Sequence, residues 1–142
     1  MKKVVGILAV AVMAFVVMSS FSSKGTGTGI EFAKFNLEAA KKKASKSGKL
    51  IFIDAYTDWC GPCKQMAATT FKDPEVGKFF NKNFVNLKVE MEKDADGREI
   101  ARRYRVRAYP TLLIIDGDGN LVKSVIGFKT KDQLMAIAES VL

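Results

Sequence analysis

The chain has 142 residues, of which 48% are hydrophobic and 27% charged, and its formal net charge is +8. This composition is typical of a single globular domain with a sizeable core. The chain has no histidine, which excludes most catalytic triads and most zinc sites, and we predict no metal site. The moderate basic excess could favour acidic partners or membrane surfaces. We expect it to reflect solvated helix faces instead, and we expect no nucleic-acid binding.

The N-terminus has the pattern of an export signal. A short basic stretch precedes an uncharged apolar run, residues 4–18, and small residues follow it. This pattern predicts a signal peptide over residues 1–22. An uncleaved membrane anchor stays open, because Lys3 and Lys24 bracket a long uncharged stretch. Either form is expected to place the domain in the periplasm or another extracytoplasmic compartment. Membrane contact is expected only through this segment, and only if it stays uncleaved.

The rest of the chain is predicted to be one domain behind a linker. Glycine, serine and threonine dominate residues 23–30, which we predict to be flexible, and residues 31–142 follow as the folded domain. Helical and strand patterns alternate there. In chain order we expect helix 37–47, strand 50–56, helices 60–70 and 73–82, strand 84–91, helix 96–104, strands 111–115 and 120–126, and helix 130–141. This order predicts an α/β fold, with a central mixed sheet flanked by helices on both faces.

The segment Trp59-Cys60-Gly61-Pro62-Cys63 contains the only two cysteines of the chain. A disulfide that closes so small a loop adds little stability, so redox chemistry explains the spacing better. The helix that opens at Cys60 favours the thiolate form there. Cys63 lies one turn further in, and we expect it to be more buried. We predict that Cys60 attacks a partner disulfide and that Cys63 resolves the mixed disulfide.

The residues around the pair are expected to shape the site. Gly61 and Pro62 permit the tight turn, and Pro62 is tolerated in the first turn of a helix. Trp59 is the single tryptophan and is expected to cover one side of the site, with plain core packing as the alternative.

On this motif the chain resembles the thioredoxin superfamily, over residues 32–142. Asp54 matches the family's buried aspartate, which accepts a proton from the second cysteine, and Lys88 matches the lysine that pairs with it. Independently of the resemblance, a carboxylate within an apolar strand is costly, and burial raises its pKa. Asp54 is therefore an obvious proton shuttle in a chain without histidine. The alternative is a strand-end residue that caps a local turn.

Two further positions carry the resemblance. Tyr109-Pro110 matches the family's cis-proline segment, which lies beside the active-site sulfurs. A cis peptide would aim the Tyr109 backbone at a substrate strand, whereas a trans edge proline is the alternative. Gly127 matches the glycine that lets a substrate backbone approach.

Several segments depart from the simplest thioredoxins. Residues 70–76 are similar to the soluble periplasmic domain at the C-terminal end of membrane thiol–disulfide interchange proteins, whereas residues 90–97 are longer and more acidic than usual. The arginines of residues 98–107 and the lysines of residues 41–43 are expected to be solvated surface.

These patterns together predict an exported thiol–disulfide oxidoreductase that works mainly as a protein-disulfide reductase. An oxidase or isomerase of the same fold, and a non-catalytic binding module, stay open as alternatives. The pair Cys60 and Cys63 carries the electrons itself, so no cofactor is expected. The expected partners are protein disulfide clients and a membrane thiol–disulfide reductase as electron donor, and the protein is expected to be a monomer.

Overall fold

The computed structural model describes residues 29–142. The predicted signal peptide or anchor, and most of the predicted linker, lie outside the described residues. Gly29 and Ile30 are buried, and the Ile30 N–H donates to the Phe71 carbonyl oxygen at 2.7 Å. The linker prediction is therefore wrong for these two residues, because the apolar Ile30 side chain packs into the domain. Within residues 29–142 no helix has the length and apolar character needed to span a bilayer.

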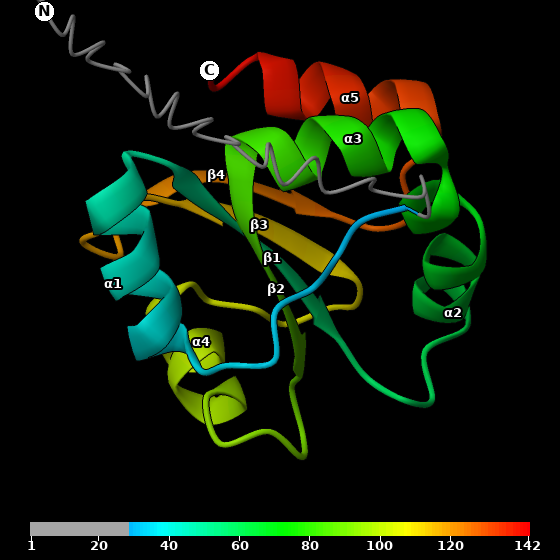
Figure 1. Ribbon diagram of the computed structural model, residues 1–142. Helices are drawn as coiled ribbons and strands as arrows, with labels where there is room; N and C mark the ends of the chain where they lie inside the picture. The colour runs from blue at the N-terminus through cyan, green and yellow to red at the C-terminus, as the bar shows by residue number, and fades with distance from the viewer. Residues whose placement is uncertain (1–28) are drawn as a thin grey trace, which may run out of the picture.

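The core of the fold is one mixed sheet of four strands in the order β2-β1-β3-β4 (Figure 1). β2 runs parallel to β1, whereas β3 is antiparallel to both β1 and β4. The strands are β1 (Leu50–Tyr56), β2 (Phe84–Glu90), β3 (Thr111–Ile115) and β4 (Leu121–Ile126). Each of them overlaps a predicted strand, so the mixed sheet expected from the sequence is confirmed.

Helices α1 and α5 begin at residues with the expected capping chemistry. Asn36 accepts a hydrogen bond from the Ala39 N–H at the start of α1, and Thr130 forms a capping box at the start of α5. The predicted helix 60–70 ends earlier, at Ala68, and a short 3-10 turn follows it. The helices are α1 (Leu37–Ser47), α2 (Gly61–Ala68), η1 (Thr70–Lys72), α3 (Pro74–Asn83), α4 (Gly97–Arg103) and α5 (Lys131–Glu139).

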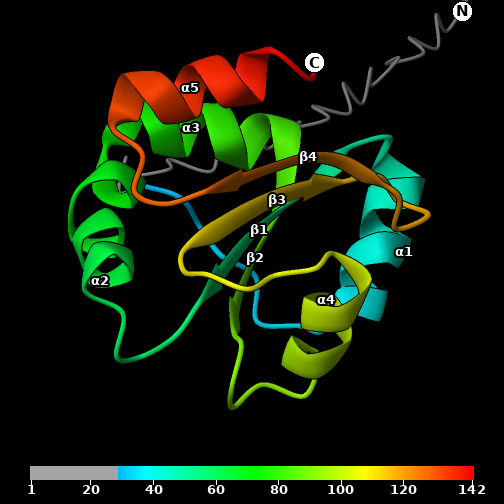
Figure 2. The ribbon, with the colours of Figure 1, turned by 180° about the vertical axis from the view of Figure 1, so that it is seen from behind.

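Helices cover both faces of the sheet, as predicted. Successive side chains of β1 point to opposite faces. Ile51 and Ile53 belong to the cluster that includes residues of α1 and α4. Phe52 belongs to the other cluster, with Met66 of α2 and residues of α3 and α5. The ribbon seen from both sides shows α1 and α4 together, well apart from α2 (Figures 1 and 2).

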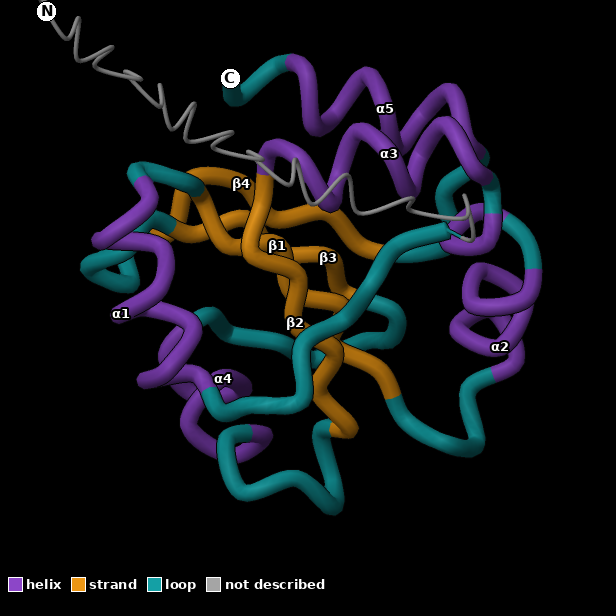
Figure 3. The backbone as a smooth tube through the Cα atoms, viewed as in Figure 1, coloured by secondary structure: helices purple, strands orange, loops and turns teal. Residues whose placement is uncertain are grey.

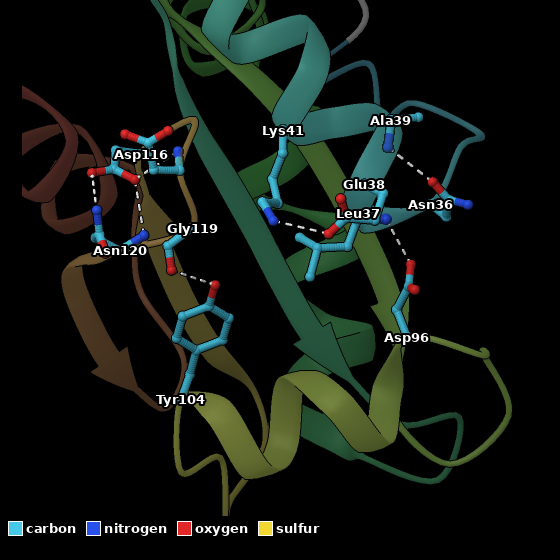
Figure 4. Close-up of polar contacts among 11 residues, drawn as sticks. Asn36, Leu37, Glu38, Ala39, Lys41, Asp96, Tyr104, Asp116, Gly119 and Asn120 are labelled. Carbon is cyan, nitrogen blue, oxygen red and sulfur yellow. Dashed lines mark hydrogen bonds and ion pairs between the residues drawn. The ribbon is translucent and has the colours of Figure 1, made fainter.

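Polar contacts join α1 and α4 into one layer. The Leu37 N–H donates to Asp96 Oδ2 at 2.7 Å, which ties the start of α1 to the residue before α4. After α4, the Tyr104 hydroxyl donates to the Gly119 carbonyl oxygen at 2.8 Å in the turn between β3 and β4 (Figure 4). The first contact ties α1 to the start of α4, and the second ties the end of α4 to the turn between β3 and β4.

Candidate functional site

The two cysteines form a disulfide at the N-terminus of α2. Cys60 is the capping residue of the helix, in an extended conformation, and Pro62 lies within the first turn. The Cys63 N–H donates to Cys60 Sγ at 3.2 Å. This N–H is one of the donors that a helix start leaves unpaired, and it favours negative charge on the sulfur it faces. The predicted placement of the pair is therefore confirmed.

The two cysteines differ less in burial than the sequence suggested. Cys60 is 4% exposed and Cys63 is 2% exposed. The expected contrast in exposure is therefore small, because Cys60 is packed into the start of the helix. The clear asymmetry lies in hydrogen bonding, since the helix start donates to the Cys60 sulfur.

Asp54 and Lys88 form the ion pair that the family resemblance implied. Lys88 Nζ lies 2.8 Å from Asp54 Oδ2, and the two residues face each other across β1 and β2. Asp54 is 1% exposed, and its Oδ1 has no hydrogen-bond partner among residues 29–142. Burial raises the pKa of Asp54, against the opposing effect of Lys88. Asp54 shares a face of β1 with Phe52, the face that α2 covers, so it lies in the layer beneath the disulfide helix.

Aromatic rings surround the Lys88 ammonium. Its Nζ lies 4.3 Å from the Tyr56 ring centroid, 5.4 Å from that of Phe71 and 5.5 Å from that of Phe32. Such contacts stabilise a cation that is partly removed from water. A pocket of about 180 Å³, lined in part by Phe32, Phe71 and Lys88, opens beside it. Sequence reasoning missed the role of Phe32 here, because that residue stands at the domain boundary and outside any predicted element.

Trp59 stands on the rim of the site. Its side chain is 65% exposed, so the alternative of core packing is wrong. The indole N–H donates to Glu92 Oε2 at 3.1 Å, and the ring meets Tyr109 edge-on with centroids 5.9 Å apart. Burial and the nearby carboxylates of Glu92 and Glu90 raise the pKa of Tyr109. Trp59 is therefore contacted by residues of two other loops, Glu92 after β2 and Tyr109 before β3.

The other predicted contact residues also lie where the fold brings loops together. The Tyr109–Pro110 peptide is cis, and the Gly127 N–H donates to the Pro110 carbonyl oxygen at 2.8 Å. Gly127 has a φ of 89°, a conformation that favours glycine. Gly61 is exposed, and a side chain added there would meet nothing within 4 Å.

Comparison with known proteins assigns this architecture. A family model described as the thioredoxin-like domain matches residues 37–142. The chain belongs to the thioredoxin-like domain family.

Relatives of this thioredoxin-like chain include much longer proteins. It is 36% identical over 86 residues, 59% of its length, to the thiol:disulfide interchange protein DsbD of Colwellia psychrerythraea, and spans 14% of that protein. It is 32% identical over 102 residues, 70% of its length, to the protein of the same name from Haemophilus ducreyi, and spans 18% of it.

Solved structures give the same assignment. A Bacteroides thetaiotaomicron protein, proposed to be a disulphide isomerase, superimposes with a TM-score of 0.71 and 40% identity, covering 81% of this chain and 95% of its own. The oxidised C-terminal domain of DsbD from Neisseria meningitidis gives a TM-score of 0.63 and 26% identity, covering 80% of this chain and 99% of its own. A chain of about this extent therefore folds by itself.

The protein is a thiol–disulfide oxidoreductase of the thioredoxin family. Thioredoxin-like proteins use their own cysteine pair as the redox group and need no external cofactor. Within residues 29–142 no group of three or more potential ligand side chains is placed to hold a metal ion.

Glu90 is a residue of this thioredoxin-like site that sequence reasoning missed. It is 4% exposed, and its carboxylate accepts backbone hydrogen bonds from Asp58 at 3.1 Å, Glu92 at 3.0 Å and Lys93 at 2.6 Å. Because β1 and β2 are parallel, the loops that follow them leave the same end of the sheet (Figure 3). Glu90 joins these two loops, and an ion pair between Lys93 and Asp58 reinforces the junction. The one available signal was its position two residues after Lys88, on the same face of the strand.

Proposed function

We propose that the protein reduces disulfides of other proteins outside the cytoplasm. The observation that carries this proposal is the disulfide at the start of α2, where the Cys63 N–H faces Cys60 Sγ. In the dithiol form, the same N–H would stabilise a Cys60 thiolate, which is the attacking species in thiol–disulfide exchange.

The electrons move in two exchange steps. The Cys60 thiolate attacks one sulfur of the client disulfide, so a Cys60–client disulfide forms and the other client sulfur leaves as a thiolate. The Cys63 thiolate then attacks Cys60 Sγ, which forms the Cys60–Cys63 disulfide and releases the second client thiolate. The client gains two electrons, and the enzyme loses two.

Asp54 is proposed to accept the proton that Cys63 must lose before it attacks. A carboxyl group whose pKa is raised by burial is better suited to take up a proton than an ordinary carboxylate. Its unpartnered Oδ1 is free to accept a hydrogen bond, while Oδ2 stays on Lys88. Lys88 is proposed to position this carboxylate.

Client recognition is proposed to use the rim of the site. Trp59, Gly61 and Pro62 are exposed around the disulfide, and Gly127 offers a backbone that a second chain can approach. The backbone of Tyr109, beside Pro110, is proposed to pair with an extended client segment. Such pairing depends on backbone groups, so it would tolerate many client sequences.

The electron donor is proposed to be a membrane thiol–disulfide reductase, in keeping with the likeness to DsbD proteins. An extracytoplasmic location follows from the N-terminal sequence pattern, which predicts export. An extracytoplasmic location would also explain the need for a reductant supplied through the membrane, since the thioredoxin and glutathione systems are cytosolic.

A trapping experiment tests the proposal. In Cys63→Ala the second step is impossible, so clients should accumulate as mixed disulfides on Cys60 and be released by dithiothreitol. Cys60→Ala is the matched control and should trap nothing. Equal trapping by both variants, or a wild-type protein that leaves insulin unreduced in the presence of a reductant, would contradict the assignment.

Isomerase activity is the second candidate, because the Bacteroides protein at 40% identity is proposed to be a disulphide isomerase. The equilibrium reduction potential separates the roles. A value of about −270 mV supports reduction, a value of about −180 mV supports isomerisation, and a value of about −120 mV indicates an oxidase. If Cys60→Ser/Cys63→Ser retained full cellular function, the protein would act as a binding module.

A further inference from the structure

The layer formed by α1 and α4 carries an uneven share of the charge. The two helices, Leu37–Ser47 and Gly97–Arg103, contain seven lysine and arginine residues and two glutamates, a net charge of +5. The other described residues carry thirteen lysine and arginine residues and thirteen carboxylates, a net charge of zero. The overall basic excess is therefore concentrated on one side of the molecule, the side shown in Figures 1 and 2 as α1 and α4.

The charges of the two helices converge on one surface. On α1, Glu38, Lys42 and Lys46 are exposed and spaced four residues apart. Residues with this spacing lie on the same side of a helix, so the three form a stripe along α1. Lys41 donates a hydrogen bond to Glu38. The pKa of Glu38 is lowered first by Lys41, and then by the nearby charges of Lys42 and of Arg103 on α4.

The turn between β3 and β4 brings the same cations together. A side chain at Gly119 would meet the Arg103 guanidinium at 3.1 Å and the Lys41 Cε at 3.4 Å. Arg102, the preceding residue of α4, is also exposed. We call Lys41, Lys42, Lys46, Arg102 and Arg103 the basic face. Of these five, only Lys41 has an ion-pair partner among residues 29–142.

The composition of the basic face favours a lipid surface over a protein partner. Protein interfaces depend on a few buried aromatic or aliphatic anchors. The strongly exposed large apolar side chains of residues 29–142 are Trp59, Leu121, Val122, Ile126 and Leu142, and none of them lies on α1 or α4. A surface without such anchors binds by charge alone, which suits a laterally fluid layer of anionic headgroups. It also offers no strongly exposed aromatic ring on which a nucleic-acid base could stack.

We propose that the basic face docks the domain on a bilayer rich in anionic phospholipid. This surface covers the Ile51 side of the sheet, whereas α2 and its disulfide belong to the Phe52 side. The exposed carboxylates of Asp58 and Glu92, beside Trp59, are repelled by the same headgroups. Docking therefore leaves the disulfide accessible to clients. The proposal rests on the charges of residues 29–142 and holds whether or not the apolar run 4–18 stays attached.

Vesicle binding by residues 29–142 tests the proposal, because the apolar run 4–18 would bind any bilayer by itself. The fragment should bind vesicles of equal parts phosphatidylglycerol and phosphatidylcholine at low salt, and should leave pure phosphatidylcholine vesicles unbound. High salt should release it, since the attraction is screened.

Two triple variants of equal net charge locate the surface. Lys42→Gln/Lys46→Gln/Arg102→Gln should weaken vesicle binding by about 10- to 100-fold. The matched control, Lys78→Gln/Lys82→Gln/Lys123→Gln, removes three exposed cations from α3 and β4 and should bind within about threefold of the wild type. The circular dichroism spectra of both variants should match that of the wild type.

Trp59, the single tryptophan, reports the orientation. Its fluorescence emission maximum should stay unchanged when vesicles bind, because it stands on the rim of the redox site. A blue shift would place the redox site against the lipid and overturn the proposal. Equal weakening by both triple variants, absence of binding to anionic vesicles, or tighter binding to duplex DNA at the same concentration of negative charge would also overturn it.

Discussion

Two buried carboxylates on the neighbouring strands β1 and β2 differ in their hydrogen bonding. Asp54 of β1 faces Lys88, and Glu90 of β2 faces Tyr56. Asp54 holds one lysine and leaves Oδ1 without a partner among residues 29–142. Glu90 accepts three backbone hydrogen bonds from the two loops that it joins.

The difference in hydrogen bonding suggests a chemical role for one carboxylate and a structural role for the other. A buried carboxylate with an unused oxygen is unstable in its charged form and ready to take a proton. A carboxylate that satisfies several backbone donors holds its neighbours in place. We therefore propose separate roles for two similar residues in similar surroundings, proton transfer at Asp54 and loop positioning at Glu90.

The largest expected effect is on stability at Glu90. Glu90→Ala leaves three backbone N–H groups without their acceptor and should lower the free energy of unfolding by about 4 kcal/mol. Glu99→Ala removes an exposed glutamate and should change it by less than about 0.5 kcal/mol. Urea denaturation of the oxidised proteins measures both. Similar values for the two variants would remove the supporting role of Glu90.

The next effect is on catalysis at Asp54. Asp54→Asn removes the proposed proton acceptor and should slow insulin reduction by about 100-fold at neutral pH. Glu90→Gln, which keeps the shape and most of the hydrogen bonds, should cost only a several-fold loss at a temperature where it stays folded. If the two variants lost activity equally, proton transfer would not distinguish the two carboxylates.

A smaller effect is the pH dependence of stability. Burial raises the pKa of Asp54 in the folded state, whereas the unfolded chain has the ordinary value of about 3.9. The folded state therefore binds this proton more tightly. Its stabilising contribution is complete below about pH 4 and is lost as pH rises through the folded pKa.

This loss should appear as a difference between wild type and Asp54→Asn. With the disulfide intact, the wild type should lose stability relative to the variant as pH rises from about 4, by at most about 1.4 kcal/mol per pH unit. Urea titrations across this range measure it. A gain in relative stability over the same range would mean that Lys88, and not burial, dominates the Asp54 site.

The smallest expected effect is at the rim. Glu92→Ala removes the acceptor of the Trp59 indole N–H and should lower the free energy of unfolding by less than about 1 kcal/mol, because the bond is exposed. It should nevertheless free the ring, which faster decay of tryptophan fluorescence anisotropy would show. Glu139→Ala is the matched exposed control. Unchanged anisotropy in Glu92→Ala would mean that Tyr109 alone orients the indole.

The sequence predicted the elements whose patterns are local. The apolar run 50–56, the capping residue Asn36 and the spacing of Cys60 and Cys63 each depend on neighbours in the chain. The Asp54–Lys88 pair followed from the family resemblance, and in the structure the two side chains lie within hydrogen-bonding distance of each other.

Contacts between distant loops could not be predicted in this way. Glu90 looked like one member of an acidic stretch, since nothing in its local sequence shows that it bonds to the Asp58 N–H. Ile30 followed a glycine-rich segment, and its packing depends on η1, 41 residues further on. The near-equal burial of the two cysteines likewise depends on how the surrounding loops close.

The low exposure of both cysteines has a consequence for specificity. Diffusible thiols and disulfides lack a surface with which to dock, so they meet sulfurs that are almost fully covered. A protein that binds the rim gains the contact time and orientation that such molecules lack. We therefore expect the cysteine pair to exchange electrons faster with proteins that dock on the rim than with small diffusible thiols.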